Sequence, residues 1–211
     1  MDARGQAAGE ASPRIAVREA ACRRGGRLLF SGVSLALAPG QAALVSGPNG
    51  IGKSSLLRML CGLLPVFAGN IEATGEMALA DDRLALDSDR PLGSALALWA
   101  GIDGRPDGVR HALDAFALTS LTDVPVRMLS TGQRKRAVLA RVHASAAPVW
   151  LLDEPANGLD TASIALLGRA VEGHLARGGI VIAASHQPLP WPETVHLTLA
   201  RPPETDGEDL P

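Results

Sequence analysis

Residues 46–55 read SGPNGIGKSS, and this stretch decides the fold. Between Gly47 and Ser54 it fits the pattern G-x-x-x-x-G-K-[ST], with an apolar strand pattern before it and a helical pattern after it. Glycines allow backbone conformations that turn successive N–H groups inward around phosphate oxygens. A strand, such a loop and a helix in this order are typical of a phosphate-binding loop, so we expect residues 47–55 to hold a nucleotide.

The side chains of this loop have separate expected roles. Lys53 is expected to reach the β- and γ-phosphates and to act in catalysis, and the Ser54 hydroxyl is expected to ligate Mg²⁺. The nucleotide-binding set also includes the other loop residues: Gly47, Pro48, Asn49, Gly50, Ile51, Gly52 and Ser55. The alternative is a glycine-rich turn with a chance Lys-Ser pair, which the flanking strand and helix patterns make the weaker interpretation.

A second apolar strand pattern, VWLLD at 149–153, ends in two carboxylates. Asp153, at the strand end, is expected to ligate Mg²⁺, as such a residue does in phosphate-loop NTPases. Glu154, one residue further on, can orient or deprotonate an attacking water, which makes it the expected catalytic base. The alternative is that both carboxylates only cap the turn before Pro155.

A third stretch, VRMLSTGQRKRAVL at 126–139, contains a predicted helix start with Ser130 at the N-cap position. A helix N-terminus carries unpaired N–H groups and a partial positive charge, which suit an anion. The chain already has a phosphate loop, so the sequence raises the question of whose phosphate this second site would bind. The basic residues 134–136 are interpreted as a solvated helix face.

The composition is that of a globular protein. The chain has 211 residues, of which 46% are apolar and 20% charged, and a net charge of −2. This length suits one domain, and the charge gives no electrostatic reason to expect nucleic acid as a partner. Cys22 and Cys61 lack metal-ligand or C-x-x-C spacing and are expected to be buried thiols of a reducing compartment. We recognise no signal peptide, and no stretch approaches the roughly 18 apolar residues of a membrane span.

The order of strand and helix patterns predicts the architecture. Strand patterns occur at 14–23, 28–38, 41–47, 148–153 and 179–185, helical patterns at 54–62, from 131 and at 161–176, and a helical insert at about 81–145. This alternation predicts an α/β fold with a mostly parallel core sheet, additional antiparallel strands and a helical subdomain. We expect one domain over 14–200, with 1–13 and 201–211 as flexible tails.

Taken together, these motifs resemble the ATP-binding-cassette (ABC) ATPases, a branch of the phosphate-loop NTPases. The phosphate loop, helical insert, LSTGQ at 129–133, carboxylate strand, NGLD at 157–160 and ASHQP at 184–188 stand in that family's order. LSTGQ is the most specific element. The resemblance implies ATP and Mg²⁺ as ligands and a second copy of the chain packed head to tail. Ser130, Gly132 and Gln133 of one copy would then contact the nucleotide held by the other, which answers the question raised by the second helix start.

The resemblance implies further site residues and also has gaps. His186 is expected to contact the γ-phosphate in a catalytic role, and Asp160 is expected to couple the two sites. The family's glutamine at the start of the insert is missing, and its slot falls near Asp82 or Arg83. The adenine-stacking aromatic residue is missing too, in a chain without tyrosine, and Arg24 or its neighbour Arg23 could stack on the base instead.

Within that family, the matching stretches are most similar to the ATPase subunits of the haem exporters of bacterial cytochrome c maturation. This implies a separate membrane-spanning permease, peripheral attachment to the cytoplasmic face of the inner membrane, and an indirect link to haem or a haem chaperone. Two alternatives stay open: the ATPase of another short ABC exporter, or a non-hydrolysing, nucleotide-gated regulatory subunit. The remaining histidines are interpreted as surface or packing residues: His111, His143, His174 and His196.

Overall fold

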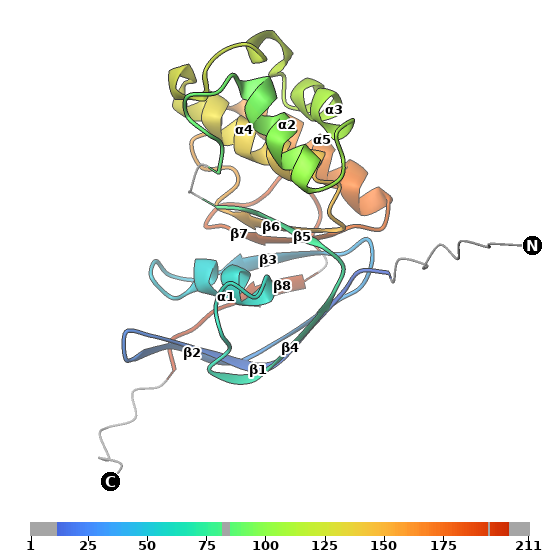
Figure 1. The fold of residues 1–211 in the computed structure, drawn as a ribbon. Helices are drawn as coiled ribbons and strands as arrows, with labels where there is room; N and C mark the ends of the chain where they lie inside the picture. Colours follow the sequence, from blue (N-terminus) through green and yellow to red (C-terminus); the bar gives the residue numbers. More distant parts are fainter. Residues whose placement is uncertain (1–11, 82–84, 194, 203–211) are drawn as a thin grey trace, which may run out of the picture.

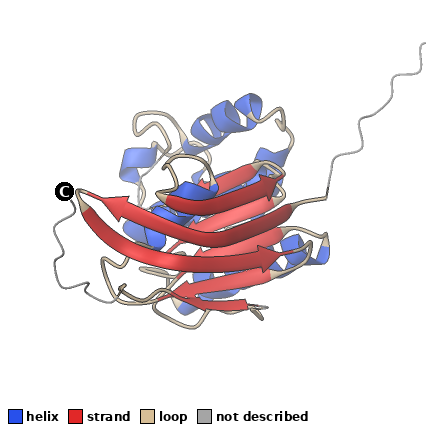
Figure 2. Ribbon diagram, turned by 90° about the horizontal axis from the view of Figure 1, so that it is seen from below, coloured by secondary structure: helices blue, strands red, loops and turns tan. Residues whose placement is uncertain are grey.

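The computed structural model describes residues 12–81, 85–193 and 195–202 as three layers (Figure 1). A layer of helices covers one face of a parallel sheet, and an antiparallel sheet faces the other. Seen from below, the strands of the antiparallel sheet lie in front of the other two layers (Figure 2). This is the α/β arrangement that the strand and helix patterns predicted.

The parallel sheet has the strand order β5-β6-β7-β3-β8. Its strands are β3 (Ala42–Ser46), β5 (Met77–Ala80), β6 (Val149–Asp153), β7 (Ile180–Ala184) and β8 (Val195–Thr198). In register, β7 residue Ala184 pairs with Asp153 of β6 and with Val45 of β3. The carboxyl ends of these three strands therefore meet at one edge, where ligands bind in open α/β sheets.

The antiparallel sheet has the order β2-β1-β4. It contains β1 (Arg14–Arg24), β2 (Arg27–Leu37) and β4 (Ala68–Thr74). Helix α1 (Lys53–Leu60) packs between the two sheets, because its buried side chains join a core cluster with residues from both. The segment that follows the phosphate loop is therefore enclosed on two sides.

The helical layer contains α2 (Leu92–Ile102), α3 (Gly108–Ala115), α4 (Thr131–Ala144) and α5 (Thr161–Ala176), with 3-10 turns at Thr119–Leu121 and Val126–Met128. The side chains of strand β6 contribute to the hydrophobic core on each face of the parallel sheet. Val149 and Leu151 belong to the cluster between the sheets, whereas Trp150 and Leu152 belong to the cluster under the helices. Successive strand residues point to opposite faces, so a nearly unbroken apolar run fits a strand buried on both sides.

Most of the sequence-based expectations for these elements are confirmed, and some are wrong. Helix 161–176 has the predicted bounds, but β4, β5 and β8 were not predicted. Cys22 is buried as expected, whereas Cys61 is only half-buried, and both are free thiols. Most of the expected tails and the slot at Asp82 and Arg83 lie outside the described residues. Within the described part of the chain, we find no helix with the length and apolarity that crossing a membrane requires.

Candidate active site

The phosphate loop connects β3 to α1 in the conformation that its glycines permit. Gly47 has φ +137°, and a Cβ atom at this position would lie 2.7 Å from the Leu199 carbonyl oxygen. Gly52 has φ +109° and lies against the Phe30 ring, where a Cβ would be 3.0 Å away. Ile51 points its side chain into the core between the sheets. The loop therefore needs glycine for backbone conformation and for close packing, as its pattern indicated.

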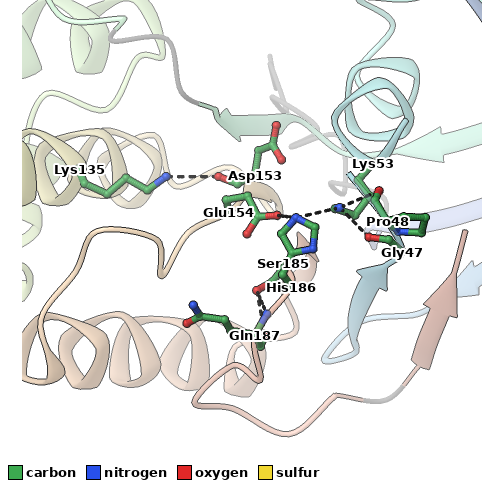
Figure 3. Close-up of polar contacts among 9 residues, drawn as sticks. All are labelled: Gly47, Pro48, Lys53, Lys135, Asp153, Glu154, Ser185, His186 and Gln187. Atoms are coloured by element: carbon green, nitrogen blue, oxygen red, sulfur yellow. Dashed lines mark hydrogen bonds and ion pairs between the residues drawn. The ribbon is translucent and has the colours of Figure 1, made fainter. Parts of the chain in front are cut away.

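Lys53 is the first residue of α1, and its side chain is buried against the loop. Its Nζ donates to the Gly47 carbonyl at 2.9 Å and contacts the Pro48 carbonyl at 3.5 Å (Figure 3). It also lies 3.2 Å from Nε2 of His186. In this structure the Lys53 ammonium group therefore binds carbonyl oxygens of the loop. A bound phosphate could replace these oxygens as its partner.

The two carboxylates follow directly from the end of β6. Asp153 is the last residue of the strand, and Glu154 is the first residue of the turn after it. Glu154 has φ +46°, a left-handed conformation that costs a residue with a Cβ atom about 1–2 kcal/mol. Strain of this kind is commonly found at functional sites. It turns the Glu154 side chain toward His186 instead of along the strand (Figure 3).

His186 lies between the lysine and the glutamate. Its Nε2 atom is 3.2 Å from Lys53 Nζ and 3.2 Å from Glu154 Oε1. A single ring nitrogen cannot accept a hydrogen bond from Lys53 and donate one to Glu154 at the same time. The buried Ser185 hydroxyl supports the histidine by closing a turn, in which it donates to the Gln187 carbonyl and accepts from the Gln187 N–H.

These residues surround a cavity of about 400 Å³ at the carboxyl edge of the sheet. Its lining combines the phosphate loop, both carboxylates and the histidine: Leu29, Asn49, Gly50, Gly52, Lys53, Ser54, Ser55, Asp153, Glu154 and His186. The sequence did not identify Leu29, which offers an aliphatic surface beside the loop. Its only signal was its place in the strand pattern at 28–38.

The two arginines proposed for adenine stacking do not line this cavity in the described part of the chain. Arg23 is held elsewhere, because its guanidinium lies over the Phe67 ring at 5.5 Å and donates to the Gly26 carbonyl. Arg24 is exposed and stands opposite Arg27 in the β1–β2 register. The stacking role of Arg24 stays a prediction.

The LSTGQ stretch starts α4 with a reciprocal capping box. The Gln133 N–H donates to Ser130 Oγ at 3.3 Å, and the Ser130 N–H donates to Gln133 Oε1 at 2.8 Å. The N–H groups of Thr131 and Gly132 lie in the first turn, where a helix has no acceptor of its own. Ser130, Gly132 and Gln133 do not line the cavity of their own chain. They form a separate anion-attracting end in a fixed conformation.

Asp160 caps a different helix. Its Oδ1 accepts a hydrogen bond from the Ser163 N–H at 2.8 Å, at the start of α5. Hydrogen bonds from Ser163 lower the pKa of the Asp160 carboxyl, which is exposed. The segment before α5 approaches the start of α4, since a Cβ at Gly132 would lie 3.7 Å from the Gly158 carbonyl oxygen. A local capping role therefore stands beside the predicted coupling role of Asp160.

The expectation that residues 134–136 form a solvated face is wrong for Lys135 and Arg136, whereas Arg134 is exposed. All three side chains donate to backbone carbonyls: Arg134 to Leu129, Lys135 to Asp153, and Arg136 to Phe116 and Ala117. Lys135 and Arg136 are half-buried. Carbonyls at the ends of neighbouring elements need donors, and long basic side chains on one helix reach three different segments. Sequence periodicity carries no information about such contacts.

Comparison with known proteins places the chain in a family. Residues 30–157 match the ABC transporter family. Because the match covers more than half of the chain and includes the phosphate loop, the LSTGQ stretch and the carboxylate strand, the chain belongs to the ABC transporter ATP-binding family. The resemblance found from the motifs is confirmed.

The curated relatives are more specific. The chain is 52% identical over 186 residues to a Zymomonas mobilis protein named cytochrome c biogenesis ATP-binding export protein CcmA, covering 88% of this chain and 84% of that protein. A protein of the same name from Novosphingobium aromaticivorans is 55% identical over 177 residues, covering 83% and 90%.

Among solved structures, a Pyrococcus furiosus chain described as an ABC transporter ATP-binding protein matches with a TM-score of 0.78 at 21% identity. That match covers 88% of this chain and 97% of the other. A second structure, an ATP-binding subunit of an ABC transporter, matches with a TM-score of 0.73 at 20% identity, covering 82% and 80%. At these identities the likeness concerns the fold, and it confirms the expected phosphate-loop NTPase fold of the ABC type.

Proposed function

We propose that this chain hydrolyses ATP as one half of a head-to-tail pair in which each copy completes the nucleotide site of the other. The observation that carries this proposal is the separation of two phosphate-binding features in one chain. The cavity contains the loop, the carboxylates and His186, while the preformed α4 start with Ser130 and Gly132 lies outside it. A second copy can bring its own α4 start to the γ-phosphate, where its N–H groups and helix dipole stabilise negative charge.

The oxygen donors of the cavity fit Mg²⁺. Ser54 and Asp153 both line it, and this ion usually takes one or two protein oxygens together with phosphates and waters. Among the residues the structure describes, there is no cluster of three or more His, Cys, Asp or Glu that could cage a metal. When bound, Mg²⁺ neutralises charge on the β- and γ-phosphates.

The remaining side chains supply positioning and proton transfer. We assign Lys53 to the β- and γ-phosphates, for which it would exchange its present bond to the Gly47 carbonyl. Once Lys53 moves away, an N–H at His186 Nε2 could donate a hydrogen bond to the phosphate or to Glu154. Glu154 would orient the attacking water and accept its proton, a contribution of roughly 10²–10⁴ in rate.

We further propose that the hydrolysis energises an exporter in cytochrome c biogenesis, with haem or a haem chaperone as an indirect partner. The names and the high two-way coverage of the curated relatives support this. Such a subunit would bind a membrane-spanning permease and be held at the cytoplasmic face of the inner membrane. In a deletion strain, haem-stained c-type cytochromes should disappear, and wild-type protein but not the Lys53→Met variant should restore them.

Each alternative makes a different prediction. An ABC ATPase for another exported substrate would leave c-type cytochromes intact in the deletion strain. A non-hydrolysing regulatory subunit is suggested by the missing glutamine and the missing adenine-stacking aromatic, and it predicts no ATP turnover in the assembled complex. The presence of all five side chains that hydrolysis requires favours the enzyme: Lys53, Ser54, Asp153, Glu154 and His186.

A mixed-subunit experiment tests the shared site. Lys53→Met inactivates the phosphate loop of its own chain, and Gly132→Asp places a negative charge at the α4 start. If sites are shared, a pair with one substitution on each chain retains one intact site and about half of the activity per pair. A pair with both substitutions on one chain and none on the other retains no intact site.

An unshared site predicts the reverse result. A lone wild-type subunit would then hydrolyse ATP beside the doubly substituted partner, and the two singly substituted chains would both be inactive. That outcome would reject the proposal. Gel filtration of each mixture, with differently tagged chains purified through both tags, establishes that mixed pairs are the species measured.

A further inference from the structure

The peptide group between Asp153 and Glu154 is held at both of its polar atoms. Its carbonyl, on Asp153, accepts a hydrogen bond from Lys135 Nζ at 3.3 Å (Figure 3). Its N–H, on Glu154, donates to the Ala184 carbonyl at 2.8 Å. The first bond comes from α4 in the helical layer, and the second comes from the neighbouring strand β7.

The orientation of this peptide sets the direction of the Glu154 side chain. Glu154 has φ +46°, which a residue with a Cβ atom keeps only when its surroundings fix it. The β7 bond anchors one side as part of the sheet. Of the two bonds, the Lys135 bond comes from outside the sheet, and it links the peptide to α4.

Lys135 lies one turn along α4 from Gly132. The start of this helix is the part that contacts the other copy's nucleotide in the proposed pair. A half-buried lysine on the same rigid helix therefore connects the partner-facing end to the carbonyl next to the base. A side chain of this length is flexible, but the helix that carries it is continuous over Thr131–Ala144.

We propose that Lys135 is a positioning residue that sets the Asp153–Glu154 peptide, and hence the catalytic carboxylate, according to the position of α4. Docking of α4 on the partner's nucleotide would hold the carbonyl and aim Glu154 at the water. The inference rests on the proposed function, since it requires a shared site. Lys135 does not line the cavity and donates to a backbone carbonyl, so it acts through the peptide and not as a catalytic residue.

The test uses the full chain with Lys135→Met, which keeps the aliphatic stem and removes the donor. We expect kcat for ATP to fall about tenfold while KM stays within twofold, because nucleotide contacts are unchanged. Lys135→Arg, which restores a donor, should recover at least half of kcat. Arg169→Met, on the exposed side of α5, removes the same charge elsewhere and should leave both constants unchanged.

A measurement of ATP-dependent pairing distinguishes a positioning role of Lys135 from a role in association of the two copies. In a Glu154→Gln background, ATP-dependent pairing should be the same with and without Lys135→Met. An unchanged kcat, a KM that rises with the fall in kcat, or a loss of pairing would each overturn the positioning role. The mixed-subunit experiment, carried out on chains that keep Lys135, tests the shared site by itself. Failure of the proposed function can therefore be distinguished from failure of this inference.

Discussion

The two edges of the parallel sheet differ in character. At the carboxyl edge, charged side chains and the phosphate loop line a cavity of about 400 Å³. At the amino edge, near Pro148 and Gly179, a larger cavity of about 630 Å³ is lined in part by Trp150, His143 and His174. The candidate active site is therefore not the larger opening. This difference indicates that the chemical nature and orientation of the lining side chains identify a functional site, whereas the volume of the cavity does not.

The amino edge is built from aromatic packing. Trp150 and His174 are stacked with ring centroids 4.0 Å apart, and His143 lies 5.9 Å from Trp150. Burial lowers the pKa of His174 to about 4, with the Arg177 guanidinium acting in the same direction. Burial also lowers the pKa of His143. Both imidazoles are therefore neutral at neutral pH, and both are packing residues, one of the two roles that the sequence analysis gave them.

The two edges differ in the features that cost folding free energy. At the amino edge, three buried nitrogens have no hydrogen-bond partner within the described ranges: His143 Nδ1, Trp150 Nε1 and His174 Nε2. An unpaired buried group costs about 1–3 kcal/mol. At the carboxyl edge the cost lies at Glu154, which combines a left-handed backbone with a buried Oε1 atom that has no hydrogen-bond partner among the described residues. Substitutions at the two edges should therefore separate activity from stability.

The largest expected effect is on turnover at the carboxyl edge. Glu154→Gln keeps the shape of the side chain and removes the proposed base, so kcat should fall roughly 10²- to 10⁴-fold while the proposed ATP-bound pair accumulates. Steady-state hydrolysis and gel filtration with ATP measure the two effects. The midpoint of thermal unfolding should be unchanged within error. Wild-type turnover in this variant would show that another group is the base.

At the amino edge, the corresponding loss is in stability. Trp150→Ala should lower the free energy of unfolding by about 3–5 kcal/mol, since it empties a buried ring site and removes the stack on His174. Denaturant melts measure this loss, and kcat per folded molecule should stay constant. Trp150→Phe should cost less, because it keeps a ring and removes the unpaired N–H. A selective fall in kcat in either variant would mean that the two edges are coupled.

Acid should destabilise the protein through His174. Because its folded pKa is about 4 and the ordinary value is 6.5, the unfolded chain binds more protons between these pH values. Stability is therefore fully present above about pH 6.5 and falls as the pH drops toward 4, by up to about 3 kcal/mol. Urea melts at several pH values measure the slope. His174→Phe should flatten it partly, since His143 contributes in the same direction, and an unchanged slope would contradict the assignment.

The smallest effect concerns the backbone strain at Glu154. Glycine adopts φ +46° without a Cβ penalty, so Glu154→Gly should be more stable than Glu154→Ala by about 1 kcal/mol. At an ordinary position, glycine is the less stable of the two. Both variants lose the carboxylate, so a comparison of their unfolding midpoints isolates the backbone. Equal stability, or a more stable alanine variant, would argue against strain at this residue.

Much of the carboxyl edge could be predicted because its chemistry is local in sequence. The phosphate loop, Asp153 and Glu154, and His186 each follow a strand pattern directly, and parallel strands bring such positions together. Helix 161–176 was predictable because its apolar spacing and its Asp160 cap are contained in one segment. These are cases in which neighbours in sequence determine the structure.

The sequence-based predictions fail where contacts between segments far apart in the sequence determine the structure. Strand β4, AGNIEAT, is mostly exposed and has no alternating pattern, so it exists through pairing with β1. The four-residue strands β5 and β8 are too short to show a period. The contacts of Lys135 and Arg136 with carbonyls of other segments, and the place of Leu29 in the cavity, depend on tertiary packing. No spacing rule along the chain contains that information.

The reciprocal bonds between Ser130 and Gln133 have a consequence for how two subunits meet. Because the start of α4 is already rigid in a single chain, association immobilises few new torsions there and loses little conformational entropy. In the proposed pair, the charge of the shared triphosphate would then mainly determine how long the two subunits stay together. Two such subunits would associate when ATP binds and separate after the terminal phosphate is hydrolysed, so the rate of hydrolysis would set the time they spend together.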